Sequence, residues 1–294
     1  MVTPSGRETY AKFEKYFDYY DLCGEARKAL RESAEKICAC EASLADALKI
    51  KDRLADPAAD FDPGAGFKDR TPQFCAFVFT LAIENMENLY NKKNIPRDVL
   101  TDTIGDLAVW INRNYEWYGE WGFAQPGWII HHIRGNLFKL GRLQFEMAKV
   151  GDWNMPPEGL NLGIKKGDPF LSVHIPRGGK LEESACLDSF ERAKLFFPQV
   201  LGYDFKAFGC FTWLFDPAFE KLLPPESNII KFQNLFIRFP GRESYGGLDY
   251  VFVNITKENI QDAPTDTYFR KKLVGHILNG GIMQTGGGYR LNKN

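Results

Sequence analysis

Two residues combine the chemistry of a general base with a place on a predicted strand. His174 lies near the end of the strand expected over Phe170–Ile175, where alternation puts it on the face opposite Val173 and Ile175. Glu146 ends the strand-like run GRLQFE. An imidazole that titrates near neutral pH, or a carboxylate beside a cleft, can take a proton from an attacking nucleophile. A hydrogen-bonded strand histidine and a solvated carboxylate fit the same positions, so both roles stay open for each residue.

A paired glycine turn follows the strand that carries His174. Gly178 and Gly179 stand between two basic residues, Arg177 and Lys180. Glycines without side chains let the backbone approach a pyrophosphate, and the two cations would neutralise its charge. Taken alone, these four residues also fit an ordinary turn between a strand and a helix.

The segment after this turn predicts a helix that begins at Asp188 and runs to Phe197. Asp188 and Glu191 have the spacing of a capping box, in which the two side chains satisfy the first N–H groups of a helix. Backbone N–H groups at a helix start attract anions. Strand, glycine turn and helix together therefore indicate a phosphate site, which would suit the pyrophosphate of coenzyme A.

Other residues with reactive side chains have a weaker case. Cys210 lies within the apolar run GCFTWLF, which predicts a buried thiol with a raised pKa. Ser227 precedes an apolar helix expected over Asn228–Phe236, the usual place of an N-cap. The glycine-rich run GGIMQTGGGYRL has neither a dinucleotide fingerprint nor the lysine of a phosphate loop, and predicts a flexible turn before a last strand.

The composition predicts a folded globular protein. The chain has 294 residues, 44% of them hydrophobic, which suffices for one large domain or two ordinary ones. A net charge of -1 gives no field that favours nucleic acid or an anionic membrane, and we expect neither as a partner. No targeting segment or long apolar run is present, so a cytoplasmic protein is expected. The six cysteines lack the spacing of a disulfide or metal framework, so we expect free thiols and no metal.

The hydrophobic period changes before the middle of the chain, which predicts two domains and an α+β fold. Helical spacing over Arg27–Leu54, Gln73–Tyr90 and the residues after Pro96 predicts a helical N-terminal domain over residues 1–135. Alternation from about Leu137 predicts a mixed sheet covered by helices over residues 136–294. Further elements are expected as strands at Phe170–Ile175, Lys206–Phe215 and Tyr250–Ile255, and as helices at Ala218–Leu223 and Thr267–Leu278. The aromatic segment 115–128 fits a seam between domains or the wall of a cleft.

Several segments together resemble the bacterial two-domain acyltransferases, in which a helical N-acyltransferase N-terminal domain precedes a GNAT-like C-terminal domain. The resemblance covers Gly141 to about Gly288 and rests on GRLQFE, KKGDPFLSVHIPRGGKL, DSFERAKLFF, CFTWLFDP and SNIIKFQNLF. It implies a GNAT fold, in which one strand splays from its neighbour. The pantetheine arm of an acyl-CoA would pair with the opened edge near Val173 and Ile175, and the pyrophosphate would sit at the loop that begins at Arg177.

The resemblance implies an acyl-CoA-dependent N-acyltransferase. The acyl group, expected to be acetyl, would pass from acetyl-CoA or another acyl-CoA to a small-molecule or peptide amine by direct attack, with Glu146 or His174 as the base. In one respect the chain departs from the family pattern: about eight residues separate Gly179 from Asp188, whereas the usual GNAT turn runs directly into its helix. A non-catalytic acyl-CoA or small-molecule binding module is therefore the alternative. A homo-oligomer is compatible with either function.

Overall fold

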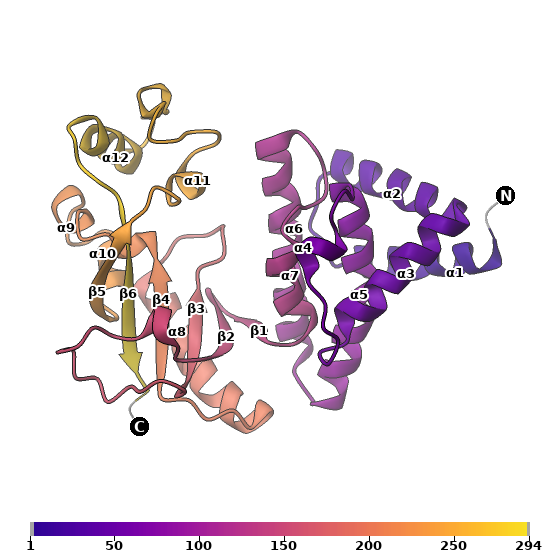
Figure 1. Ribbon diagram of the computed structural model, residues 1–294, viewed down its shortest axis with the longest axis horizontal. Coiled ribbons are helices and arrows are strands. Elements are labelled where there is room, and N and C mark those ends of the chain that lie inside the picture. The colour runs from indigo at the N-terminus through magenta and orange to yellow at the C-terminus, as the bar shows by residue number, and fades with distance from the viewer. Residues whose placement is uncertain (1–2, 293–294) are drawn as a thin grey trace. The chain divides into compact units, whose positions relative to one another are not determined.

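The computed structural model describes residues 3–292. The chain divides into two compact units, one ending at Lys139 and the other beginning at Leu140. The first unit is helical, and the second contains a mixed sheet with helices (Figure 1). The predicted α+β fold, with a helical part before a sheet covered by helices, is confirmed. The domain boundary after residue 135 stays a prediction.

The first unit is built around a long apolar helix. Its helices are α1 (Pro4–Phe17), α2 (Gly24–Ala39), α3 (Glu41–Ala55), α4 (Pro63–Gly66), α5 (Pro72–Lys92), α6 (Arg97–Tyr118) and α7 (Pro126–Ile133). Helix α5 is buried along most of its first half, from Phe74 to Ile83, because α1, α2 and α3 pack against it. Such an all-round apolar helix belongs in the middle of a helical layer.

The helical prediction for Arg27–Leu54 is confirmed, and the chain forms two helices there, α2 and α3. Cys40 ends α2 and precedes α3 in an extended conformation, with φ -107° and ψ 110°. At about 1.5 Å per residue, a continuous helix over both would be longer than α5 itself. The break lets both helices pack on α5, which the local hydrophobic spacing could not indicate.

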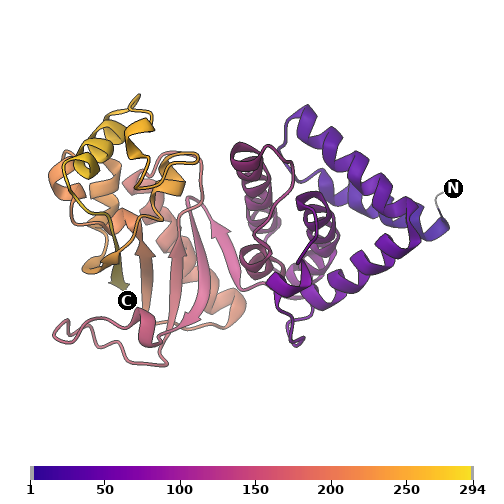
Figure 2. The ribbon, with the colours of Figure 1, turned by 45° about the horizontal axis from the view of Figure 1, so that its top comes forward.

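The chain forms a six-stranded sheet in the order β1-β2-β3-β4-β6-β5. Strands β2 to β6 lie in the second unit, and the division between the units falls within β1. Strands β2 and β3 are antiparallel, β3 and β4 are parallel, and β6 is antiparallel to both β4 and β5. Figure 2 shows these strands as one twisted layer. The strands are β1 (Leu137–Leu140), β2 (Leu143–Lys149), β3 (Pro169–His174), β4 (Ala207–Thr212), β5 (Ile237–Glu243) and β6 (Gln284–Leu291).

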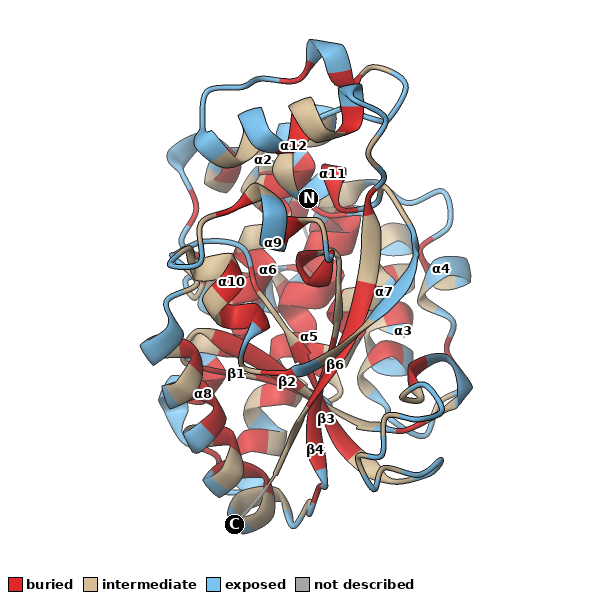
Figure 3. Cartoon of the chain, turned by 90° about the vertical axis from the view of Figure 1, so that its left-hand side faces the viewer, coloured by how far each residue is buried: buried red, intermediate tan, exposed pale blue. Residues whose placement is uncertain are grey.

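Each face of this sheet has its own aromatic core. On one face Phe145 and Phe208 pack against Phe190 of α8 (Glu183–Phe196). On the other face Phe170 packs against Tyr289. Figure 3 shows buried residues running along β2, β3, β4 and β6. The remaining helices are a π-helical turn (Phe197–Leu201), α9 (Phe219–Leu222), α10 (Asn228–Gln233), α11 (Leu248–Val251), α12 (Tyr268–Leu278) and three short 3-10 turns (Asp152–Asn154, Trp213–Phe215 and Ile260–Asp262).

The end of the chain differs most from the prediction. The strand expected over Tyr250–Ile255 is wrong: the short helix α11 ends at Val251 and bends follow it, because Leu248, Phe252 and Ile255 all turn into one hydrophobic cluster. Strand β5 was not predicted, since Pro240 interrupts it, yet an edge strand with an irregular register tolerates proline.

The glycine-rich run near the C-terminus is part of a central strand. The predicted last strand is present as β6, but it begins earlier than expected, because Gly286 to Gly288 lie within it, between β4 and β5. A Cβ atom on Gly287 would come within 2.3 Å of the Phe239 ring, and one on Gly288 within 2.8 Å of the Phe215 ring. The glycines leave room for these rings on both faces of the sheet.

The reactive side chains fall into exposed and buried groups. The six cysteines are free, with Cys23 and Cys40 exposed and the other four buried. Burial raises the pKa of the Cys210 thiol, as predicted from its apolar neighbours. Within residues 3–292, no group of three or more His, Cys, Asp or Glu side chains is arranged to hold a metal ion. No helix in the same range is both long enough and apolar enough to cross a bilayer.

The turn between β1 and β2 is tied to α8 by one buried serine. Ser189 is fully buried, and its Oγ accepts hydrogen bonds from the N–H groups of Arg142 (2.9 Å) and Leu143 (3.3 Å). The hydroxyl donates to the carbonyl oxygen of Ala185 at 2.8 Å. Gly141 has φ 72°, and a Cβ atom there would lie 3.0 Å from Ser189 Oγ, so the close approach needs glycine.

Replacing Ser189 by alanine would leave two N–H groups of this turn without their acceptor. We expect Ser189→Ala to lower the free energy of unfolding by about 2 kcal/mol, the usual cost of buried donors left unsatisfied. Urea unfolding measures the change. Ser184→Ala, at an exposed position of the same helix, is the matched control and should be nearly neutral. Equal effects of the two changes would contradict this account.

Candidate active site

Glu146 and His174 form a hydrogen-bonded pair on the sheet. In the β2–β3 register Glu146 lies opposite Ser172, and His174 is two residues further along β3. The two side chains are thus diagonal neighbours on one face. His174 Nε2 is 2.9 Å from Glu146 Oε2, and the side chains are 28% and 19% exposed. The structure therefore brings the two candidate bases together as one partly accessible pair.

The pair lies on the face of the sheet opposite α8. Phe145 points toward α8, so the next residue, Glu146, points the other way. On β3, His174 shares its face with Phe170, which packs against Tyr289 on that same side. Residues 150–168 cross part of this face, with Met155, Leu162 and Ile164 packed on the core cluster of Phe170 and Tyr289.

Aromatic side chains continue along this face beyond the pair. Phe211 of β4 packs edge-to-face against Phe170. The ring of Trp153 lies 5.0 Å from that of Phe211, yet this tryptophan is 74% exposed. The Tyr289 hydroxyl donates to the carbonyl oxygen of Asn154 at 2.7 Å, which fixes the segment that carries Trp153. An apolar surface therefore extends from the core of this face to solvent.

The parallel pairing between β3 and β4 is short. Its register consists of Leu171 opposite Phe208 and Ser172 opposite Gly209. Strand β4 remains paired with β6 as far as Thr212, three residues further on. The β4-facing edge of Val173, which follows Ser172, therefore has no register partner on β4. The Val173 side chain is buried, and Ile175 is half-buried just after β3 ends.

The helix after the glycine turn begins earlier than predicted. Helix α8 starts at Glu183, and its N-cap residue Glu182 makes no side-chain cap bond, so the predicted capping box at Asp188 is wrong. Asp188 and Glu191 instead lie inside the helix, because i, i+3 spacing also occurs between neighbours on a helix surface. Three residues separate Gly179 from Glu183, so the loop is close to the family pattern.

The glycine loop has the backbone that its sequence predicts. Gly178 and Gly179 have φ 93° and 70°, and open space surrounds the Cβ position of each. The side chains of Arg177 and Lys180 are exposed beside them. Glu182 and Glu183 place two carboxylates at the start of α8, where they oppose binding of an anion by the helix end itself.

Arg142 holds the backbone of this loop by hydrogen bonds, a role that the sequence did not reveal. Its guanidinium donates to the carbonyl oxygens of Pro176 (3.0 Å), Lys180 (3.0 Å) and Gly179 (3.4 Å). Burial lowers the pKa of this arginine from its usual range. In the sequence, Arg142 can be recognised only as an arginine directly after a turn glycine. No local pattern indicates that this turn contacts residues 176–180.

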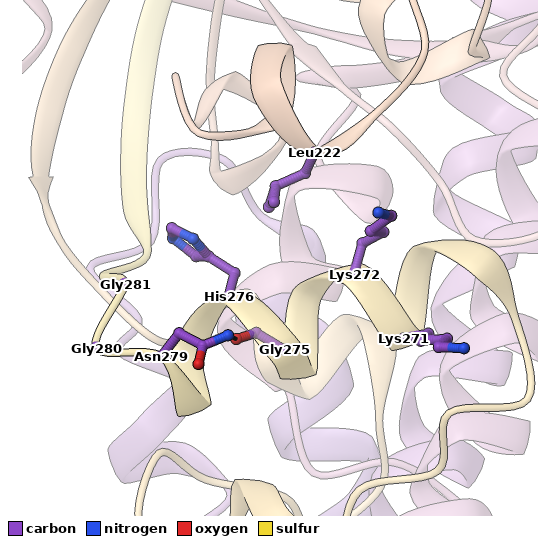
Figure 4. A pocket seen from close by; sticks show the side chains of 8 residues that line it. All are labelled: Leu222, Lys271, Lys272, Gly275, His276, Asn279, Gly280 and Gly281. Atoms are coloured by element: carbon purple, nitrogen blue, oxygen red, sulfur yellow. Dashed lines mark hydrogen bonds between the residues drawn. The ribbon is translucent and has the colours of Figure 1, made fainter.

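A separate shallow cavity of about 660 Å³ lies at the end of α12. Lys272 and His276 project from α12 toward Leu222 of α9 (Figure 4). His276 Nε2 donates to the carbonyl oxygen of Ile282 at 3.0 Å. None of the predicted site residues lines this cavity.

Comparison with known proteins agrees with this architecture. The N-acyltransferase N-terminal domain matches residues 11–135, and the GNAT-like C-terminal domain matches residues 137–290, more than half of the chain. No curated protein sequence matches significantly.

Solved structures share the fold across both units. The crystal structure of an acyltransferase in complex with decanoyl-CoA and teicoplanin is 23% identical over 93% of this chain and 90% of that chain, with a TM-score of 0.71. An acyltransferase mutant in complex with octanoyl-CoA is 23% identical over 92% of this chain and 88% of that chain, with a TM-score of 0.70. With both family domains present in this order, the chain belongs to the acyltransferase family that joins an N-acyltransferase N-terminal domain to a GNAT-like C-terminal domain.

Proposed function

We propose that this acyltransferase moves an acyl group from coenzyme A to an amine, with His174 as the base. The observation that carries the proposal is the end of the β3–β4 pairing beside the His174–Glu146 pair. An open strand edge offers backbone groups to the amides of a pantetheine arm, in the manner of an added strand. The thioester would then lie next to the imidazole. Val173 and Ile175 would flank this arm.

The pair gives each residue a separate task. In the neutral tautomer whose Nε2–H donates to the Glu146 carboxylate, Nδ1 is the ring nitrogen that can take up a proton. The amine nitrogen attacks the thioester carbon, a C–N bond forms, and the C–S bond breaks with the electron pair on sulfur. His174 takes the amine proton, and the carboxylate stabilises the imidazolium. CoA leaves as the thiolate and takes up a proton from water.

Two observations from the sequence favoured a non-catalytic binding module, and the structure weakens both. One was the long separation between Gly179 and the helix, which α8 shortens by starting at Glu183. The other was the lack of a defined base, for which the His174–Glu146 pair is now a specific candidate. These observations favour transfer over binding alone.

Removing the proposed base should slow transfer without weakening CoA binding. We expect His174→Ala to lower the transfer rate about 10²- to 10⁴-fold, the usual contribution of a general base. Glu146→Gln should cause a smaller loss, since it keeps a hydrogen-bonding partner but not the charge. CoA release with an amine panel measures the rate, and calorimetry measures CoA affinity.

His276→Ala, at the separate cavity, is the matched control and should leave the rate unchanged. The base assignment would be withdrawn if His174→Ala transferred acyl groups at the wild-type rate. It would also fail if CoA affinity fell in the same proportion as the rate.

The loop from Arg177 to Lys180 is proposed to hold the pyrophosphate through its backbone. In a trans peptide the N–H points opposite to the C=O. Because Arg142 holds the carbonyls of Pro176, Gly179 and Lys180, the N–H groups of the same three peptides point away from it. Such outward N–H groups form an anion-binding concavity, and the glycines leave it open. Arg177 and Lys180 add charge from their exposed side chains.

This geometry predicts that the shape of Arg142 matters more than its charge. We expect Arg142→Lys and Arg142→Ala each to weaken CoA binding about tenfold, because lysine lacks the planar fork that reaches several carbonyls. Binding of pantetheine, which carries no phosphate, should not change. Calorimetric titration measures both ligands.

Arg242→Lys, at an exposed position of β5, is the matched control. Wild-type affinity for CoA in Arg142→Lys would mean that charge alone is needed, and the backbone model would be abandoned.

The acyl chain is proposed to be longer than the acetyl group that the sequence suggested. The similar acyltransferases were crystallised with decanoyl-CoA and octanoyl-CoA. In this chain the face that carries His174 also carries Phe211 and the exposed Trp153. Those rings would cover the methylene groups of a longer chain, and an acetyl group would not reach them. The acceptor is proposed to be a small-molecule or peptide-like amine, since one similar acyltransferase was crystallised with teicoplanin.

A series of donors from acetyl-CoA to decanoyl-CoA tests the chain length. We expect kcat/KM to rise with length, by at most the ~0.8 kcal/mol that each buried methylene contributes. Phe211→Ala should reduce the preference for octanoyl-CoA over acetyl-CoA about tenfold. Tyr268→Ala, at an exposed ring of α12, is the control. Acetyl-CoA as the best donor would refute the longer chain.

A further inference from the structure

Gln144 is a buried amide beside the candidate base, and its Nε2 lacks a hydrogen-bond partner among the described residues. Its side chain is 1% exposed, and its register partner on β3 is His174. By strand alternation it lies on the same face as Glu146. Gln144 Nε2 has no hydrogen-bond partner among residues 3–292. A buried donor without a partner destabilises the fold by its full desolvation free energy.

Another buried glutamine shows the usual arrangement. Gln233 is also fully buried, and its Nε2 donates to the carbonyl oxygen of Leu214 at 2.6 Å. Its Oε1 accepts from Arg238 at 2.7 Å. Most buried side-chain amides are satisfied in this way. The side-chain oxygens of Asn85 and Asn114 also lack a partner among residues 3–292, but Gln144 is an unsatisfied donor beside the candidate base. A bound substrate would provide the missing partner for Gln144.

The order of the strands indicates which substrate this is. The proposed acyl-CoA edge is the β4 side of β3, whereas Gln144 is on β2, the other neighbour of β3. His174 therefore stands between the two. A molecule that approaches His174 from the side of β2 is the acceptor, not the thioester.

We propose that Gln144 binds the acceptor, donating from Nε2 to an oxygen that the acceptor carries next to its reacting amine. The inference rests on the proposed transfer function. The substrate class is an amine with a neighbouring hydroxyl, ether or carbonyl oxygen. A site with a buried donor discriminates against the analogue that lacks the acceptor atom, since the donor is then left unpaired. Gln144 would thus determine specificity, while His174 handles the proton.

Stability measurements separate a binding role from a structural one. Gln144→Met keeps the length of the side chain and removes the unsatisfied donor, so we expect its Tm to rise. Gln233→Met is the matched control, and its Tm should fall because Leu214 and Arg238 lose their partner. Both proteins are measured without ligand. A fall in Tm for Gln144→Met similar to that for Gln233→Met would overturn the inference.

Substrate selectivity provides the second measurement. With wild-type protein and octanoyl-CoA, ethanolamine should exceed propylamine in kcat/KM by about tenfold or more. Gln144→Met should reduce this preference to near one, mainly by weakening the apparent affinity for ethanolamine, with unchanged affinity for CoA. A preference that survives in Gln144→Met would overturn the inference. If the wild-type protein released no CoA with any amine, the proposed function would fail, and the Tm comparison would still decide whether Gln144 is a structural group.

Discussion

The register between β2 and β3 is the constraint on which the candidate site depends. Phe145 must face α8, where it packs against Phe190 and Phe208, so Glu146 is directed to the opposite face. Pairing with Ser172 then puts Glu146 diagonal to His174. A slip of one residue would exchange the two faces, burying a carboxylate against α8 and exposing an aromatic ring. The packing of the hydrophobic core thus fixes the positions of Glu146 and His174, and no further interaction is needed to bring the two side chains together.

A single turn connects three parts of this unit. Gly141 allows the turn to approach α8, Ser189 bonds its N–H groups, and Arg142 reaches the loop that follows β3. The start of β2, the helix and the glycine loop therefore share one small polar cluster. The proposed phosphate site adjoins this cluster, and so does Glu146, the partner of the proposed base, which is four residues from Arg142 along the chain.

Much of this arrangement follows from local patterns, and the rest depends on contacts across the sheet. Alternation in residues 143–147 predicted β2, and the positive φ of Gly178 and Gly179 agrees with their glycine identity. Glu146 and His174 were each predicted as a candidate base, but their pairing was not, because the register between strands distant in sequence is not a local property. The roles of Arg142 and Gln144 could not be predicted, since the role of each depends on the residues that lie opposite in the fold. The helix start was misplaced because a capping-box spacing also occurs in the middle of a helix.

Strand β6 has a consequence for how this unit is made. It lies between β4 and β5, yet it follows both in the chain, and β5 has no other neighbour in the sheet. Its three glycines give it little tendency to form a strand by itself, so the rings of Phe215 and Phe239 must already be near their final places to receive it. On the ribosome, β5 would wait as an unpaired edge until β6 emerges. The last strand to be made is therefore an interior strand of the sheet. A chain that stopped before residue 284 would leave the facing edges of both β4 and β5 unpaired.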